Sequence, residues 1–374
     1  MNYPRIVEEF IELAELEVHV RRERAIADVV TAKLKALGFK VEEDKAGEII
    51  GGNTGNLIAT LPGSLPAPPI MFSAHLDRVE NHGSIRPQVF LEEDVIRSDG
   101  TSILAADDLS GICAILEGVR QIQEEKAAHG DIEVIFSVAE EVGLLGARNL
   151  DYSRIKSQMA YVIDTGGPLG TIINQAPTQY TFIIKVHGRS AHAGMEPEKG
   201  LSAIRVAATA LTRLREGRLS PSSTANYGII RAGKATNIVC DYAEIHGECR
   251  STDPREVSGY IEEMKQILSV VAAEFQTSIE TELNLEYNCF KVEHDEPVVR
   301  IAVEAMRNIG LEADIHPGGG GLDGNFFNEN GIKTIGISPG YVGVHTSKEE
   351  QPISQLLKCA KLVAEIIKEA AKRS

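Results

Sequence analysis

Four short apolar runs, each followed closely by a histidine or an acidic residue, most constrain what this chain can fold into. Apolar runs of this kind are typical of strands buried in an α/β sheet, where binding sites form outside the carboxyl ends of the strands. We therefore expect the polar side chains to converge at one edge of a sheet. The runs and their polar residues are PIMFSAHLD with His75 and Asp77, IEVIFSVAEE with Glu140 and Glu141, MAYVIDTGG with Asp164, and IKTIGISPGYVGVH with His345.

The order of the expected elements predicts two domains, as does a length of 374 residues. Helices and strands alternate at both ends of the chain. Between them, the order β-α-β-β-α-β is that of a ferredoxin-like unit, in which we expect one helix over 198–217. We predict an α/β domain, with a mixed central sheet flanked by helices, from residues 1–177 and 292–374. An α+β domain, residues 178–291, is inserted into it.

Charge and composition limit the partners of this chain. Its 54 acidic and 38 basic residues give a net charge of −16, and the absence of a basic stripe argues against nucleic acid. No apolar run approaches the about 18 residues of a membrane span. The acidic N-terminal stretch is unlike a signal peptide, and five scattered cysteines without C-x-x-C spacing indicate reduced thiols. We expect a cytoplasmic protein with no membrane partner.

A pair of aspartates in SILAADDLSGICAIL, Asp107 and Asp108, opens an expected helix. Aspartate is favoured at a helix N-cap, where its charge suits the helix dipole. Capping explains one aspartate of the pair and not both. We therefore take Asp107 as a candidate metal ligand and Asp108 as the residue nearer the cap.

The residue types in this set indicate a dication site. Imidazole and carboxylate ligands suit zinc, cobalt or manganese, and the absence of thiolate argues against a structural zinc site. Two histidines and three of these acids are already too many for one catalytic zinc ion. They suit two metal ions that share a carboxylate and a water, roughly 3.5–4 Å apart. We expect two divalent ions, with Zn²⁺ favoured and Co²⁺ or Mn²⁺ as alternatives.

The ordered motifs H-x-D, A-D-D and E-E-x-G, then an aspartate after a strand and a late histidine, resemble the peptidase T branch of the co-catalytic dizinc peptidases. Aminoacylases, glutamate carboxypeptidases and amidohydrolases are also in this family. The resemblance spans nearly the full chain and includes the inserted domain. It implies a zinc-peptidase-like catalytic domain and an inserted domain that closes over the substrate as a lid and mediates dimers.

The resemblance also implies a role for each residue of the set. His75 and Asp164 bind one metal ion, Glu141 and His345 bind the other, and Asp107 bridges the two ions. Asp77 accepts the other N–H of His75 and fixes its tautomer. Glu140 is the general base that takes a proton from the metal-bound water, which is the nucleophile.

Three residues of the inserted domain are candidate substrate contacts by the same resemblance. His192, in HGRSAHAGMEPEKG, matches a histidine that reaches over the metals, and a surface-loop histidine is the alternative. Asn237, in ATNIV, and Arg250 match positions near the substrate, with Arg250 a candidate for binding a carboxylate. A structural role is equally open for both.

Two departures from the family pattern lie beside the expected site. Arg78 follows the H-x-D pair where peptidase T-like chains usually carry threonine, and the continuation VENHGSIRPQV differs from the usual glycine-rich stretch. Both bear on peptide specificity more than on hydrolysis.

These features predict a dizinc metallopeptidase that removes N-terminal residues from short peptides, and a homodimer formed through the inserted domain. Two alternatives stay open. The first is a deacylase, carboxypeptidase or amidohydrolase of the same family acting on N-acyl amino acids. The second is a metal-binding relative without catalysis.

Overall fold

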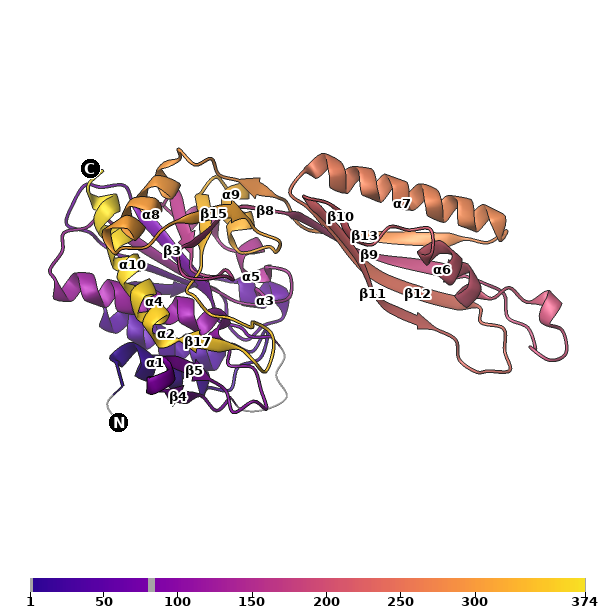
Figure 1. Cartoon of the computed structure of the whole chain (residues 1–374), viewed down its shortest axis with the longest axis horizontal. Helices are drawn as coiled ribbons and strands as arrows, with labels where there is room; N and C mark the ends of the chain where they lie inside the picture. Colours follow the sequence, from indigo (N-terminus) through magenta and orange to yellow (C-terminus); the bar gives the residue numbers. More distant parts are fainter. Residues whose placement is uncertain (1–2, 80–84, 374) are drawn as a thin grey trace. The chain divides into compact units, whose positions relative to one another are not determined.

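The computed structural model describes residues 3–79 and 85–373. The chain forms two units (Figure 1). The first comprises Met1–Ala176 with Phe290–Ser374, and the second comprises Pro177–Cys289. Of the stretch VENHGSIRPQV, residues 80–84 lie outside the described residues. No helix in the described part of the chain is both long and apolar enough to cross a membrane.

A nine-stranded mixed sheet forms the centre of the first unit. Its strands follow the order β1-β2-β6-β3-β7-β16-β8-β14, and β15 pairs with β8. The predicted fold class, an α/β protein with a mixed central sheet and an inserted α+β part, is confirmed. The strands are β1 (Lys40–Glu43), β2 (Leu57–Leu61), β3 (Ile70–His75), β6 (Ile132–Ser137), β7 (Met159–Val162), β8 (Thr171–Ala176), β14 (Phe290–Lys291), β15 (Asp314–Pro317) and β16 (Lys333–Ile337).

Four neighbouring strands of this sheet, β6, β3, β7 and β16, run parallel. Strands β3 and β6 are buried along their whole length, which requires cover on both faces of the sheet. Their apolar sequences, IMFSAH and IEVIFS, fit that position. Because parallel strands end at the same edge, the polar residues after these four strands are brought to one edge of the sheet.

Helices and a small sheet complete the first unit. The apolar helix α4 packs against β3, α1 and α10, and α9 packs against β7 and β16. A three-stranded sheet of β17 (Glu350–Pro352), β5 (Val95–Arg97) and β4 (Gln88–Phe90) joins the C-terminal part of the chain to the N-terminal part. The helices are α1 (Arg5–Ala14), α2 (Arg24–Ala36), α3 (Ala46–Ile50), α4 (Ala106–Glu124), α5 (Leu145–Arg148), α8 (Pro297–Asn308), α9 (Gly324–Glu329) and α10 (Ile353–Ala371).

The second unit is a five-stranded antiparallel sheet in the order β10-β11-β12-β9-β13 with two helices, α6 and α7. Apolar residues of both helices share one core with the strands, for example Val206 and Met264 with Ile184. The elements are β9 (Thr178–His187), α6 (Ala203–Leu211), β10 (Gly217–Ser220), β11 (Ser223–Ala232), β12 (Tyr242–Ser251), α7 (Pro254–Glu274) and β13 (Ile279–Tyr287).

The helix expected over 198–217 is wrong at both ends. A short 3-10 turn begins at Pro197, and helix α6 starts only after Ser202, whose hydroxyl accepts the amide of Arg205 at 3.3 Å. The helix ends at Leu211, and Gly217, with φ of +76°, begins strand β10. The side-chain cap at Ser202 therefore fixes where the helix starts, and the chain leaves the helix after Leu211, before strand β10 begins.

Candidate metal centre

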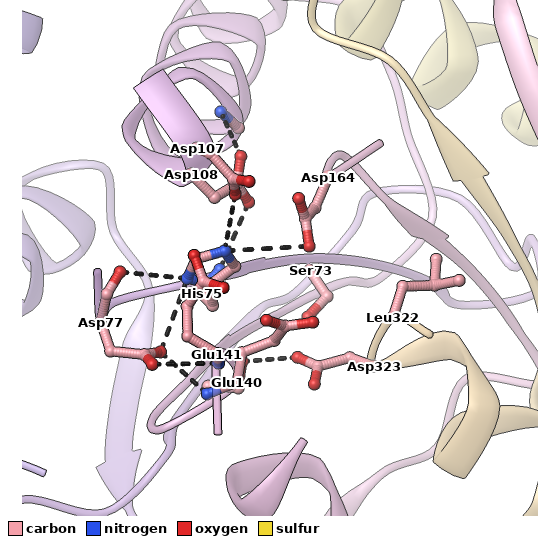
Figure 2. A network of polar contacts seen from close by, with 12 residues as sticks. Ser73, His75, Asp77, Asp107, Asp108, Glu140, Glu141, Asp164, Leu322 and Asp323 are labelled. Carbon is pink, nitrogen blue, oxygen red and sulfur yellow. Dashed lines mark hydrogen bonds and ion pairs between the residues drawn. The ribbon is translucent and has the colours of Figure 1, made fainter. Parts of the chain in front are cut away.

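The carboxyl ends of the four parallel strands carry most of the polar residues singled out in the sequence. Strand β3 ends on His75 itself, and the loops after β6, β7 and β16 lead to Glu140, Asp164 and His345. A further pair of acids comes from the start of α4, which packs on β3. Figure 2 shows the acids grouped around His75.

Asp107 lies between two histidines. Its Oδ1 is 2.9 Å from Nε2 of His75, and its Oδ2 is 3.3 Å from Nε2 of His345. Nε2 of His345 is also 3.2 Å from Oε1 of Glu141. The two oxygens of one carboxylate therefore face two different imidazoles.

The same nitrogen of His75, Nε2, also lies 3.9 Å from Oδ2 of Asp164. Oδ1 of Asp164 accepts a hydrogen bond from the hydroxyl of Tyr341 at 2.9 Å. Ligand atoms of His75, Glu140 and Asp164 lie within 4.8 Å of one another, as do those of His75, Asp107 and Glu141. The two triples share His75.

Asp77 holds the backbone of the glutamate pair. Its Oδ1 accepts the amide of Glu140 at 2.9 Å and its Oδ2 accepts the amide of Glu141 at 3.1 Å. Nδ1 of His75 is 3.1 Å from the backbone oxygen of Asp77 and 3.5 Å from its carboxylate. The family resemblance implies a role for Asp77 toward His75 alone, whereas in the structure its carboxylate also accepts both glutamate amides (Figure 2).

Two further buried side chains hold the start of the same turn. Oδ1 of Asn56 accepts the amide of Val138 at 3.1 Å, and Oε1 of Glu23 accepts the amide of Ala139 at 3.3 Å. Together with Asp77, they satisfy four consecutive amides, from residue 138 to residue 141. Ala139 has φ of +51°, a strained value for a residue with a side chain, so this turn depends on such contacts.

Asp108 serves the backbone, as the sequence analysis expected of the residue nearer the cap. Its Oδ1 accepts the amide of Gly111 at 3.0 Å, and its Oδ2 accepts the amide of His75 at 3.3 Å. A side chain at Gly111 would collide with this carboxylate and with the backbone oxygen of Ile163. Glycine therefore lets the start of α4 approach the end of β7.

The acids of this cluster repel one another in a buried setting. Burial, with a contribution from Asp164, raises the pKa of Glu140 well above its ordinary value. Burial and Asp107 do the same to the pKa of Asp164. Asp107 and Glu141 raise the pKa of His345 to about 10. Without a cation the cluster therefore retains protons, and a dication would take their place.

The residues fit a pair of divalent cations. The four carboxylates of the two triples, those of Asp107, Glu140, Glu141 and Asp164, carry a charge of −4 when ionised, which balances two dications. The donor set contains imidazole nitrogen and carboxylate oxygen and no thiolate, which suits zinc, cobalt or manganese. A carboxylate shared by two ions must direct one oxygen toward each of them, and the two oxygens of Asp107 are directed toward His75 and His345.

The three candidate substrate residues all belong to the second unit. His192 is exposed, and its Nδ1 accepts the amides of Gly194 and Met195 at 3.2 and 3.1 Å. The backbone oxygen of Asn237, also exposed, accepts the amide of Ala193 at 3.0 Å, so His192 and Asn237 lie on adjoining segments. Arg250 is half-buried on β12 and donates two hydrogen bonds of 3.0 Å to Glu248.

Arg78, the departure from the family pattern, points away from the cluster. Its buried guanidinium donates to the backbone oxygens of Leu13, Ala14 and Leu16 at 2.7, 3.2 and 3.0 Å. Burial lowers its pKa to about 10, against the influence of Glu349. This arginine therefore caps the end of α1 and ties it to the loop that carries His75 and Asp77.

Several residues that shape the site were missed in the sequence. Tyr341 and Glu349 stand in the loops around His345. Asp323 is buried, follows the glycine run, and accepts the hydroxyl of Ser137 at 2.5 Å. Asp323 and Tyr341 each follow a glycine-containing stretch near a strand end, which is the signal that could have found them.

Family models match both parts of the chain. The model for peptidase family M28 matches residues 56–185, and the peptidase dimerisation domain of the M20 peptidases matches residues 179–276. With the mixed sheet and the histidine–carboxylate cluster, these matches define a metallopeptidase.

Related proteins resemble the chain over nearly its whole length. The structure of the aminopeptidase PepT from Bacillus cereus is 38% identical, covers 98% of each chain and has a TM-score of 0.90. A tripeptidase from Staphylococcus aureus is 36% identical, with 98% of each chain covered and a TM-score of 0.94. Peptidase T of Geobacillus thermodenitrificans is 27% identical over 92% of this chain and 90% of its own. The chain belongs to the peptidase T-like branch of the M20 peptidases.

Proposed function

We propose that this peptidase is a two-metal aminopeptidase that removes the N-terminal residue from short peptides. The observation that carries the proposal is the position of Asp107, whose two carboxylate oxygens face His75 and His345. The names of its relatives, an aminopeptidase PepT and a tripeptidase, support the substrate class.

In this proposal His75 and Asp164 would hold one ion, Glu141 and His345 would hold the other, and Asp107 would be a ligand shared by both. Zn²⁺ is the favoured ion, and Co²⁺ and Mn²⁺ accept the same ligands. When bound, the ions polarise the scissile carbonyl and lower the pKa of a water molecule. Asp77 holds the imidazole of His75 through its carbonyl and carboxylate oxygens, and so fixes which nitrogen faces the ion.

Glu140 is the proposed general base. Its backbone is fixed by Asp77, while its side chain lies in the triple with His75 and Asp164. Its carboxylate takes a proton from the attacking water and delivers it to the leaving amine.

His192 is the proposed donor to the oxyanion that forms on the substrate. Because Nδ1 of His192 accepts two backbone amides, the neutral ring carries its proton on Nε2. An exposed Nε2–H is a suitable donor for a developing negative charge. We also propose Asn237 and Arg250 as substrate contacts, with Arg250 for the peptide carboxylate.

We propose that the second unit forms a homodimer, in line with the dimerisation model that it matches. Strand β11 pairs with β10 only as far as Ala225, so its later residues have no strand partner on that side among the described residues. Ile229 and Ile230 on this stretch are 47% and 53% exposed. An exposed apolar edge strand favours pairing with a second copy. Sedimentation should give a dimer, and Ile230→Lys should shift it toward monomer; a monomeric wild type would contradict this.

The five cysteines are all free and four are buried, which supports a reducing compartment such as the cytoplasm.

The test of the proposed activity compares free tripeptides with the same peptides acetylated at the N-terminus and with N-acyl amino acids. We expect release of the first residue from free tripeptides and loss of turnover on acetylation. Faster hydrolysis of the N-acyl amino acids would instead identify a deacylase, and release of the last residue would identify a carboxypeptidase. No hydrolysis by fully metal-loaded protein would favour a relative without catalysis.

A further inference from the structure

Glu349 is a buried carboxylate, 1% exposed, that contacts the loop carrying Asp107. Its Oε2 accepts the amides of Leu104 and Ala105 at 2.9 and 2.8 Å, and its Oε1 accepts the amide of Asp107 at 3.1 Å. One side chain therefore satisfies three backbone donors of a segment more than 240 residues away in the chain. Because Leu104 and Ala105 are fully buried, their amides would be costly to leave without an acceptor.

The loop that Glu349 holds needs such support. Ala105 has φ of +60°, and Asp107 and Asp108 depart from helical geometry at the start of α4. A backbone in sparsely populated conformations persists only where its surroundings determine it. The direction of the Asp107 carboxylate follows from this backbone, so contacts of the loop decide where its two oxygens point.

The backbone of Glu349 belongs to the segment that carries His345. Glu349 lies four residues after His345 and donates its amide to the backbone oxygen of Thr346 at 3.1 Å. His345 itself has φ of +61°. A second link runs alongside, because the hydroxyl of Ser110 donates to Oε1 of Gln351 at 2.7 Å. Glu349 thus joins the two segments that carry Asp107 and His345.

We propose that Glu349 is a positioning residue for the metal pair, which sets the Asp107 carboxylate so that it faces His75 and His345 together. The inference rests on the proposed two-metal function. Glu349 has no direct contact with the metal-facing oxygens and acts through the backbone. Asp107 would be shared by both ions, but the backbone of Glu349 also belongs to the segment of His345. Its loss therefore weakens the ion held by Glu141 and His345 more than the ion held by His75 and Asp164.

Glu349→Gln is the most direct variant. It keeps the size of the side chain, but only its oxygen can accept a hydrogen bond. Its NH₂ group would therefore face at least one backbone N–H, so that a donor meets a donor. Glu350→Gln is the matched control. Glu350 is the next residue, is half-buried, and lies 3.5 Å from Arg97 without contacting the loop of Asp107.

The experiment is calorimetric titration of metal-stripped protein with Zn²⁺, with urea unfolding measured in parallel. For the wild type and Glu350→Gln we expect two binding steps. For Glu349→Gln we expect one step to weaken by about 10–100-fold, the size of effect seen when groups that orient metal ligands are lost. The other step should change by less than about threefold.

Wild-type affinities for both ions in Glu349→Gln would overturn the inference, even if the variant unfolds more easily, because Glu349 would then be structural only. Equal weakening of both steps would overturn it too. If Glu349→Gln does not fold, Glu349→Asp keeps the charge with a shorter reach, and the same selective weakening is required of it. A wild type that binds two ions while Glu349→Gln is unchanged refutes this inference alone, whereas a wild type that binds no ion refutes the proposed function.

Discussion

The backbone amide of Glu140 donates a hydrogen bond of 2.9 Å to Oδ1 of Asp77. The second oxygen of the same carboxylate accepts the amide of Glu141. The carboxylate of Asp77 therefore fixes the backbone of both glutamates at this strand end. The arrangement sends the glutamate side chains into the cluster while the chain itself stays fixed.

Replacing Glu140 by alanine tests the base directly. We expect turnover to fall by about 10²–10⁴-fold, the usual contribution of a general base, with both metal ions retained. Steady-state kinetics and elemental analysis of the same preparation measure the two quantities. Activity near that of the wild type would refute the assignment, and a loss of metal would show that Glu140 is a ligand.

Replacing Asp77 by asparagine tests the hold on the glutamate turn. The asparagine side chain can accept only one of the two amides through its oxygen, so one buried N–H is left without an acceptor. We expect the free energy of unfolding to fall by about 1–3 kcal/mol. Urea unfolding measures the change, and an unaltered unfolding midpoint with unaltered turnover would contradict the role given to Asp77.

Arg78→Met should destabilise the protein without changing its peptide preference. The arginine donates to three backbone oxygens at the end of α1, and hydrogen bonds to charged groups contribute about 1.5–3 kcal/mol each. We expect a loss of unfolding free energy of at least about 1.5 kcal/mol. Arg86→Met is the control, because Arg86 is 75% exposed and should change stability by no more than about 0.5 kcal/mol. A shift in the preferred peptide length in Arg78→Met would place this arginine at the substrate instead.

Glu23 gives a pH dependence. Burial, with a contribution from Asp77, raises the pKa of Glu23 from its ordinary 4.5 to about 7. The folded protein therefore binds this proton more tightly than the unfolded chain does. Stability from this proton is fully present below pH 4.5 and is lost as the pH rises to about 7.

Glu23→Gln keeps the acceptor for Ala139 and removes the titration. In metal-free protein we expect the unfolding free energy of Glu23→Gln to decline less steeply with pH between pH 4.5 and 7 than that of the wild type. The difference in slope should correspond to the uptake of up to about one proton. Urea unfolding at several pH values measures the slope. Glu8→Gln, at an exposed position of α1, should match the wild type. Equal slopes in Glu23→Gln and the wild type would contradict the prediction.

The strand ends could be predicted from the sequence because the signal there is local. An apolar run followed by a polar residue, as in IMFSAHLD, which ends at Asp77, indicates both the strand and the position of the side chain. The shape of the site depends instead on contacts that join distant segments. Glu349 with Asp107 is such a contact, and no local pattern distinguishes Glu349 from its neighbour Glu350.

Tertiary contacts also explain where sequence reasoning was incomplete. Arg78, next to the H-x-D pair, was expected to lie beside the site as a departure that bears on peptide specificity. In the structure it turns to the backbone at the end of α1, a partner more than 60 residues away. The helix expected over 198–217 was too long because periodicity does not register the cap at Ser202 or the strand that begins at Gly217.

The metal content of the purified protein tests the central claim most directly. Protein stripped of metal and then saturated with Zn²⁺ should hold two ions per chain after removal of free metal, measured by elemental analysis against protein concentration. Asp107→Asn should hold fewer, because the carboxylate that faces both histidines is lost. A wild type that never exceeds one ion per chain would contradict the account.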